Sequence, residues 1–270
     1  MIRVLALADV MGRPGRRVLD RLLPPAREEF APDIVIANGE NAAGGFGLTP
    51  KICRQFIDQF GIDCVTSGNH WRDKPDIYKI LGREPRVIIP ANAPGAAERH
   101  PGYTVLQTRA GISFAVINLL GRVFMNEETG DPFAAADRIL EAIDPAIKIR
   151  IVDFHGEASS EKQAMGRHLC GRASLVYGSH WHVQSADERI LDRRTGFITD
   201  AGMSGPYDSV IGVETSASLS RFRGESPRRF EPAKNDLWMC FIIAHLDETD
   251  GHCRQIERHR WELDRFSPKG

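Results

Sequence analysis

The chain has 270 residues, 42% of them hydrophobic and 26% charged, and its 35 basic and 36 acidic side chains leave a formal net charge of −1. This composition is typical of a globular protein, and the lack of net positive charge argues against extended nucleic-acid binding. The five cysteines form no CxxC pair, which argues against a disulfide framework and a structural zinc knuckle.

The apolar stretches are short. Residues 4–8 end at Asp9, and residues 238–243, the longest apolar run elsewhere, fall far short of the about 20 residues that a membrane helix needs. We therefore expect a cytoplasmic protein without a membrane segment. The sequence leaves the oligomeric state open, and a homo-oligomer is compatible with it.

The first two thirds of the chain alternates short β-branched runs with longer helix-like stretches, a pattern typical of an α/β fold with a mostly parallel or mixed sheet. Thr49-Pro50 and Asp131-Pro132 each place a capping side chain before a proline, so we expect helices to begin there. Pro24-Pro25 predicts a kink or two helices in the first helical stretch. The predicted strands cover residues 2–7, 33–37, 63–66, 87–89, 112–119, 147–154 and 173–177.

From about Glu188 onward the pattern changes to short strands and glycine-rich turns, and residues 238–246 and 252–263 predict a terminal hairpin. The chain contains no repeat and no low-complexity linker. We therefore predict a single domain that covers residues 1–270.

Polar side chains that are able to bind a metal follow several of the predicted strands. In open α/β sheets ligands bind beyond the carboxyl ends of the strands, so positions far apart in the sequence are expected to converge there. The residues at these positions are Asp9, Glu40, Asn41, Asn69, His70, His155, His180 and His182.

Each of these residues also has a plainer interpretation. An isolated Asp or Asn after a strand usually caps a turn, and a lone histidine more often packs or faces solvent than binds a metal. The sequence Gly178-Ser179-His180-Trp181-His182 is a stronger signal, because its two imidazoles directly follow a strand. The five segments together favour a metal site over coincidence.

Carboxylate, amide and imidazole ligands without thiolates suit Mn, Fe or Zn. A bridging carboxylate can hold two ions about 3.5–4 Å apart, an arrangement that activates a hydroxide for phosphoester hydrolysis. Gly44-Gly45-Phe46-Gly47 has neither the GxGxxG spacing nor a Walker ending, and the chain has no GxSxG elbow. Nucleotide-binding Rossmann and serine-hydrolase interpretations are therefore disfavoured.

The order Asp, Gly-Glu-Asn, Gly-Asn-His, a lone His and then His-x-His resembles the calcineurin-like metallophosphoesterase superfamily. Residues 38–44, 153–155 and 199–208 resemble its YmdB-type branch in particular, and the similarity spans residues 3–230. The resemblance implies a metallophosphoesterase-like β-sandwich flanked by helices, with the site at the carboxyl ends of the strands.

The superfamily's first motif is usually Asp-x-His, but here Val10 and Met11 follow Asp9, so that histidine is missing. The resemblance implies that Asn41 replaces it and that Glu40 bridges two ions, most readily Fe or Mn. It implies one site formed by Asp9, Glu40, Asn41 and His182, and a second formed by Glu40, Asn69, His155 and His180.

By the same resemblance His70 is not a ligand but the general acid for the leaving oxygen. The family usually has a residue between this histidine and a Trp-Asp-Lys run, whereas here Trp71 and Arg72 follow at once. Trp71 and Arg72 either contact the substrate or simply pack and face solvent, while Trp181 is expected to pack. Glu157 and Glu161 are candidate partners of the ligand histidines, and residues 200–205 are expected to border the site.

The resemblance implies a phosphodiesterase that hydrolyses 2′,3′-cyclic nucleotides, and 3′,5′-cyclic nucleotides as a second type, through a metal-bound hydroxide. A small cyclic nucleotide or a short phosphodiester is therefore the expected partner. Two alternatives remain open: a nucleotide phosphomonoesterase, and a metal-containing regulatory or RNA-associated protein with little turnover.

Overall fold

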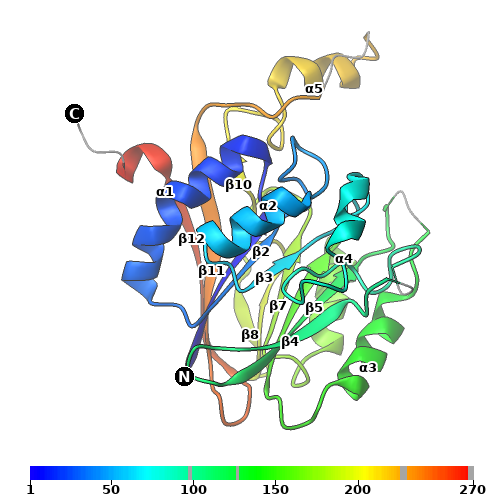
Figure 1. The fold of residues 1–270 in the computed structure, drawn as a ribbon, viewed down its shortest axis with the longest axis vertical. Helices are drawn as coiled ribbons and strands as arrows, with labels where there is room; N and C mark the ends of the chain where they lie inside the picture. Colours follow the sequence, from blue (N-terminus) through cyan, green and yellow to red (C-terminus); the bar gives the residue numbers. More distant parts are fainter. Residues whose placement is uncertain (97–98, 126–127, 226–229, 267–270) are drawn as a thin grey trace.

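Two six-stranded sheets face each other in the computed structural model of the chain, which describes residues 1–96, 99–125, 128–225 and 230–266 (Figure 1). The first sheet has β1 at its centre, with β2 and then β3 on one side and β11 on the other. β11 also pairs with β10 and β12. The bounds are β1 (Ile2–Asp9), β2 (Ile34–Asn38), β3 (Cys64–Thr66), β10 (Ser204–Pro206), β11 (Leu237–Leu246) and β12 (Cys253–Glu262).

The second sheet has the order β4-β5-β6-β7-β9-β8. β1, β2 and β3 run parallel in the first sheet, and β5, β6, β7 and β9 run parallel in the second. The strands of the second sheet are β4 (Tyr103–Gln107), β5 (Ser113–Leu120), β6 (Ile149–His155), β7 (Leu175–Ser179), β8 (Arg189–Leu191) and β9 (Thr195–Ile198).

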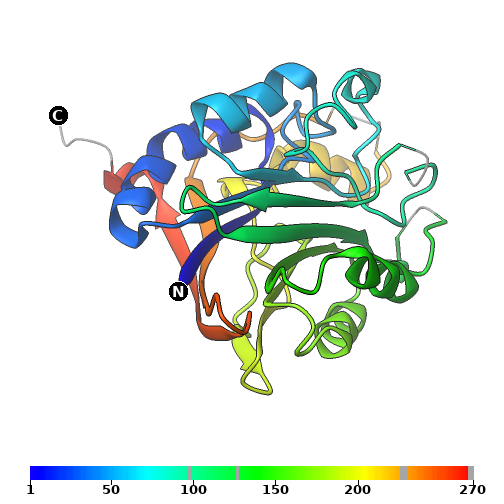
Figure 2. The same cartoon turned by 60° about the horizontal axis from the view of Figure 1, so that its bottom comes forward.

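Helices cover the outer face of each sheet, so that the molecule has four layers (Figure 2). α1 (Gly12–Phe30) and α2 (Pro50–Arg54), which continues into a π-helical turn (Gln55–Gln59), pack on the first sheet. α3 (Pro132–Ala142) and α4 (Ser159–His168) pack on the second. The remaining helical segments are α5 (Thr215–Phe222) and two short 3₁₀ turns (Pro75–Lys79 and Leu263–Phe266). This is the predicted helix-flanked β-sandwich.

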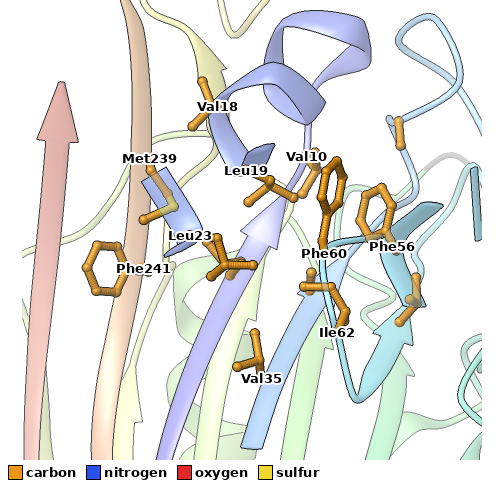
Figure 3. Close-up of a cluster of buried hydrophobic side chains, with 14 of the residues drawn as sticks. Val10, Val18, Leu19, Leu23, Val35, Phe56, Phe60, Ile62, Met239 and Phe241 are labelled. Carbon is orange, nitrogen blue, oxygen red and sulfur yellow. The ribbon is translucent and has the colours of Figure 1, made fainter. Parts of the chain in front are cut away.

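The inner core joins the two sheets. Val4 and Ile36 of the first sheet lie in the same buried cluster as Val116 and Ile151 of the second. In a separate outer core, α1 and the π-helical turn pack against the first sheet. The side chains of Leu19, Phe56 and Met239 belong to this core (Figure 3). The shared inner core supports the prediction of a single domain, which stays a prediction.

The strong local signals of the sequence are confirmed. Thr49 Oγ1 accepts the Ile52 amide at the start of α2, and Asp131 Oδ1 accepts the Phe133 amide at the start of α3. The terminal hairpin forms as β11 and β12. None of the helices within the described ranges is long and apolar enough to cross a bilayer.

One expectation about the elements is wrong, and one of the two alternatives of a second expectation is excluded. Residues 87–89 form no strand, and only Val87 makes an isolated bridge, to Val65. Pro24-Pro25 does not split the first helix, because α1 is one helix that contains both prolines. A helix tolerates internal prolines when tertiary packing stabilises it. Leu19, Leu22 and Leu23 of α1 are all buried against the sheet.

Candidate metal centre

All eight candidate residues lie at one edge of the sandwich, where the parallel strands of both sheets end. Asp9 is the last residue of β1, and His155 is the last residue of β6. Glu40 and Asn41 follow β2, Asn69 and His70 follow β3, and His180 and His182 follow β7. The convergence expected from the sequence is therefore present.

The polar contacts fall into two groups. In one group the His182 Nε2 atom lies 3.2 Å from Asn41 Oδ1 and 3.8 Å from Asp9 Oδ1. In the other group the His155 Nε2 atom lies 2.9 Å from Asn69 Oδ1, 3.1 Å from Glu40 Oε1 and 3.1 Å from His180 Nδ1. One ligand atom from each of Glu40, His155 and His180 lies within 4.8 Å of the other two.

Two carboxylates are buried side by side in this cluster. Asp9 is 0% exposed and Glu40 is 1% exposed. Burial alone would raise the pKa of Glu40, but the neighbouring His155 imidazole lowers it below its usual value. Asp9 Oδ1 is buried without a hydrogen-bond partner among the described residues. Carboxylates withdrawn from water are costly unless positive charge or hydrogen bonds compensate them, so the cluster favours bound cations.

Each of the three histidines is held by one ring nitrogen, while the other nitrogen turns toward the cluster. His155 Nδ1 lies 2.9 Å from Ser179 Oγ, His180 Nε2 lies 3.2 Å from Glu157 Oε2, and His182 Nδ1 lies 2.7 Å from the Ile211 carbonyl. Such outer partners fix the tautomer of metal-binding histidines and leave a lone pair for the ion. Burial, and then the charge of His155, lower the pKa of His180 to about 3, which keeps this ring in the neutral form that binds metals.

The backbone that carries the last two histidines is strained. His180 has a φ of 104° and His182 a φ of 62°, both in a region that side chains other than glycine rarely adopt. Each such residue costs on the order of 1–3 kcal/mol and persists where the surroundings hold it. Asp200 supplies part of that support, because its Oδ2 atom accepts the Trp181 amide. Asp200 belongs to the segment 200–205, which borders the site as expected.

His70 sits beside the cluster rather than within it. Its backbone N–H donates to Glu40 Oε2 over 3.1 Å, while its Nδ1 lies 2.8 Å from Asp73 Oδ2. Its side chain is 28% exposed, and the edge of Phe46 packs on its ring at a centroid distance of 4.9 Å. With Nδ1 occupied by Asp73, the Nε2 atom is the one available to exchange a proton.

The two tryptophans beside the histidines have structural contacts. Trp71 is 1% exposed and packs with Ile89 and Leu120, so it is a core residue. Of the two interpretations of the sequence, this one agrees with packing rather than with substrate contact. Arg72 is exposed. Trp181 donates its indole N–H to the Glu157 carbonyl over 2.6 Å, which agrees with a packing role.

One of the two glutamates that were expected to contact a ligand histidine does not do so. Glu157 contacts a ligand histidine, but this histidine is His180 rather than the nearby His155. Glu161 contacts neither, because its carboxylate accepts the backbone amides of Arg122 and Val123. Glu161 lies in α4, which begins at Ser159, whereas Glu157 precedes this helix, and from α4 the Glu161 carboxylate reaches the loop that follows β5.

Sequence reasoning missed a buried chain of hydrogen bonds behind His155. Asp153 Oδ1 accepts the Ser179 hydroxyl over 2.6 Å, and Asp153 Oδ2 accepts the Asn38 amide over 3.0 Å. Ser179 in turn lies against His155 Nδ1. Strand alternation was an available signal, because Asp153 and His155 are two residues apart and share one face of β6.

The donor set fits a pair of divalent ions. Two buried carboxylates, two amide oxygens and three oriented imidazole nitrogens converge without a thiolate, which is the mixture that borderline metals prefer. The unpartnered Asp9 Oδ1 atom would gain a partner on metal binding. Asp9, Glu40, Asn41, Asn69, His155, His180 and His182 are the residues positioned to hold the ions.

Comparisons with known proteins agree with this architecture. The family model described as "YmdB-like protein" matches residues 5–259. The chain is 40% identical to the 2′,3′-cyclic-nucleotide 2′-phosphodiesterase of Bacillus subtilis, over 95% of this chain and 96% of that protein. A crystal structure of a hypothetical protein from Thermus thermophilus has a TM-score of 0.88 at 37% identity, covering 97% of this chain and 99% of that one. A phosphatase structure from Mycoplasma pneumoniae also has a TM-score of 0.88, at 30% identity, covering 97% of this chain and 93% of the other.

Proposed function

Because the chain belongs to the YmdB-like family, we propose that it is a metal-dependent phosphodiesterase that hydrolyses 2′,3′-cyclic nucleotides and, as a second substrate type, 3′,5′-cyclic nucleotides. In this reaction the oxygen of water joins phosphorus, one ring P–O bond breaks, and the departing ribose oxygen takes a proton. The observation that carries the proposal is the set of three oriented histidines facing two buried carboxylates.

The two groups of contacts support a division of the ligands between two ions. We assign Asp9, Glu40, Asn41 and His182 to the first ion, and Glu40, Asn69, His155 and His180 to the second, with Glu40 bridging. When bound, the ions lower the pKa of a water molecule and offset the charge of the phosphate oxygens. The donors alone suit Mn, Fe or Zn, and the resemblance to the YmdB-type branch implies Fe or Mn as the native metals.

His70 is proposed as the general acid. Asp73 Oδ2 lies 2.8 Å from Nδ1 and fixes the orientation of the ring, while the bond from the His70 amide to Glu40 anchors the residue at the metal centre. The Nε2 atom then gives its proton to the departing ribose oxygen. Groups of this kind contribute about 10²–10⁴-fold to a rate.

The test is hydrolysis of 2′,3′-cyclic AMP by the metal-loaded protein and its variants. We expect His70→Ala to lower kcat by about 10²–10⁴-fold while the metal content stays unchanged, and Glu40→Gln to lower both activity and metal content. His168→Ala is a matched control, because His168 pairs with Asp137 over the same 2.8 Å as His70 with Asp73 but lies at the end of α4. Unchanged rates in both site variants would overturn the assignment.

A substrate panel separates the alternatives. A phosphomonoesterase would hydrolyse AMP faster than the cyclic ester, and a regulatory metal protein would bind about two ions per chain without turnover on any diester. The buried carboxylates and oriented histidines are compatible with both. The 40% identity to a protein named as a cyclic-nucleotide phosphodiesterase favours the diesterase.

We further propose a cytoplasmic location. All five cysteines are free, as is usual in a reducing compartment, and burial raises the pKa of Cys240 and of Cys253 to about 11, so these two thiols are poorly reactive. A homo-oligomer remains compatible with the chain and is to be tested by light scattering.

A further inference from the structure

An open groove of about 670 Å³ lies next to the loop that carries Asn41. It is formed by the first turns of α1, by Gly44 and by residues 230–237. Its volume is within the range of about 300–1,000 Å³ that is usual for small-ligand sites. Arg13, Arg17 and Lys234 line it as cations, Phe230 and Pro232 form an apolar wall, and Glu231 is the anion among its described lining residues.

The three cations of the groove are exposed and uncompensated. Within the described ranges, Arg13, Arg17 and Lys234 form no hydrogen bond or ion pair. The neighbouring Arg16 differs, because it donates to the Ala42 carbonyl and is partly buried. Burial, and then the charge of Arg13, lower the pKa of Arg16. Like charges in the first turns of a helix, where the helix dipole is itself positive, are unfavourable without an anion nearby.

The groove lies next to the proposed active site. The ring of Phe46 packs against His70 at a centroid distance of 4.9 Å and against Phe230 of the groove wall at 6.2 Å. Gly44 belongs to a turn that Asn41 closes, since Asn41 Nδ2 donates to the Gly45 carbonyl over 3.0 Å. A group attached to the nucleotide at the metal centre is therefore able to extend over Phe46 into the groove.

We propose that this groove is a subsite for the preceding phosphate of a short RNA that ends in a 2′,3′-cyclic phosphate. Such ends arise where a ribose 2′-hydroxyl attacks the adjacent phosphodiester, so an RNA-cleaving reaction of that class supplies the substrate. Arginine matches phosphate through paired N–H donors, and the apolar wall suits a sugar or base. The chemistry at the cyclic phosphate is unchanged. The inference rests on the proposed phosphodiesterase function and extends it from mononucleotides to oligonucleotide ends.

The near-zero net charge is compatible with this subsite. Three cations and one anion give the groove a local charge of about +2, enough for one or two phosphates but not for an extended duplex. The subsite therefore agrees with the expectation of a short phosphodiester partner.

The test compares 2′,3′-cyclic AMP with the dinucleotide ApA that carries a 2′,3′-cyclic phosphate, using the metal-loaded full chain. We expect wild type to prefer the dinucleotide in kcat/KM by about tenfold, which corresponds to about 1.4 kcal/mol. Arg13→Ala combined with Lys234→Ala should bring this ratio close to 1. Added KCl should lower the ratio for wild type, because phosphate contacts of this kind are screened by salt.

Arg21→Ala is the matched control, because Arg21 is an exposed arginine of α1 that does not line the groove. It should keep the wild-type ratio. A ratio near 1 in wild type, or a ratio that the double variant leaves intact, would overturn the subsite while the phosphodiesterase proposal stands. A wild-type protein that hydrolyses neither compound would overturn both.

Discussion

The Lys162 ammonium lies 2.7 Å from the Asp200 carboxylate, and the two side chains are 1% and 0% exposed. The same carboxylate oxygen accepts the Trp181 amide, and the ammonium also lies 4.2 Å from the centre of the Trp181 ring. Burial raises the pKa of Asp200, and the positive charge of Lys162 works against that rise. The ion pair thus holds the peptide between His180 and His182, the two residues with left-handed backbone.

Lys162→Met is expected to lower the free energy of unfolding by about 3–5 kcal/mol, because it leaves the Asp200 carboxylate buried and unpaired. It should also weaken metal binding, since the backbone of the two histidines loses its support. Urea denaturation and metal titration measure the two effects. Lys79→Met is the matched control, because Lys79 pairs with Asp76 where both side chains are more than half exposed, and a change of at most about 1 kcal/mol is expected there. Equal losses in both variants would contradict the role of the buried pair.

Gly68→Ala is expected to abolish metal binding at the second ion. A methyl group at this position would overlap Glu40 Oε2 and the ring of His155, so at least one of the two side chains would have to move. Gly130→Ala is the control, because its methyl group would meet only Asn92 at ordinary contact distances of 3.5 Å and more. Metal analysis of the purified variants decides the matter. A Gly68→Ala protein with wild-type metal content would mean that the centre is looser than the distances indicate.

Ser179→Ala removes the group between Asp153 and His155. We expect metal affinity to fall by about 10–100-fold, the usual effect of losing an outer partner of a metal-binding histidine. Ser174→Ala is a close control, because Ser174 lies just before β7 and Ser179 is the last residue of β7. Ser174 also makes two hydrogen bonds, one with the Arg150 amide and one with the Lys148 carbonyl. Competition with a fluorescent chelator measures the affinity. Similar affinities for both serine variants would argue against the Asp153–Ser179–His155 chain.

Divalent metal is expected to raise the melting temperature, because the ions bind the folded chain and offset the two buried carboxylates. At a metal concentration 100 times the dissociation constant each bound ion adds about 2.7 kcal/mol, or roughly 5–10 °C for a chain of this size. Scanning calorimetry of chelator-treated protein with and without Mn²⁺ measures the shift. The shift should shrink in Asp9→Asn, and an equal shift in this variant would place the stabilising ions elsewhere.

The sequence predicted the candidate ligands because each follows a strand with a clear β-branched run, and parallel strands bring such positions to one edge. It did not predict the contact between Lys162 and Asp200, because this pair joins distant segments and no spacing encodes it. It also missed the contact between Ser179 and Asp153, although strand alternation places Asp153 on the same face of β6 as His155. Residues 87–89 were predicted as a strand because all three are β-branched. They form a buried segment that pairs with β3 only through the isolated bridge from Val87 to Val65, so no strand is completed. β4 was missed because its alternation is weak, with Val105 exposed at 42%.

The division of the proposed ligands along the chain has a consequence for biosynthesis. The carboxylates and amides lie within the first 69 residues, whereas the histidines come from residues 155–182, on strands of the other sheet. A chain growing from its N-terminus therefore exposes its acidic ligands long before the imidazoles are made. A complete centre forms only after the two sheets have docked, so a chain that has not finished folding cannot hold both ions.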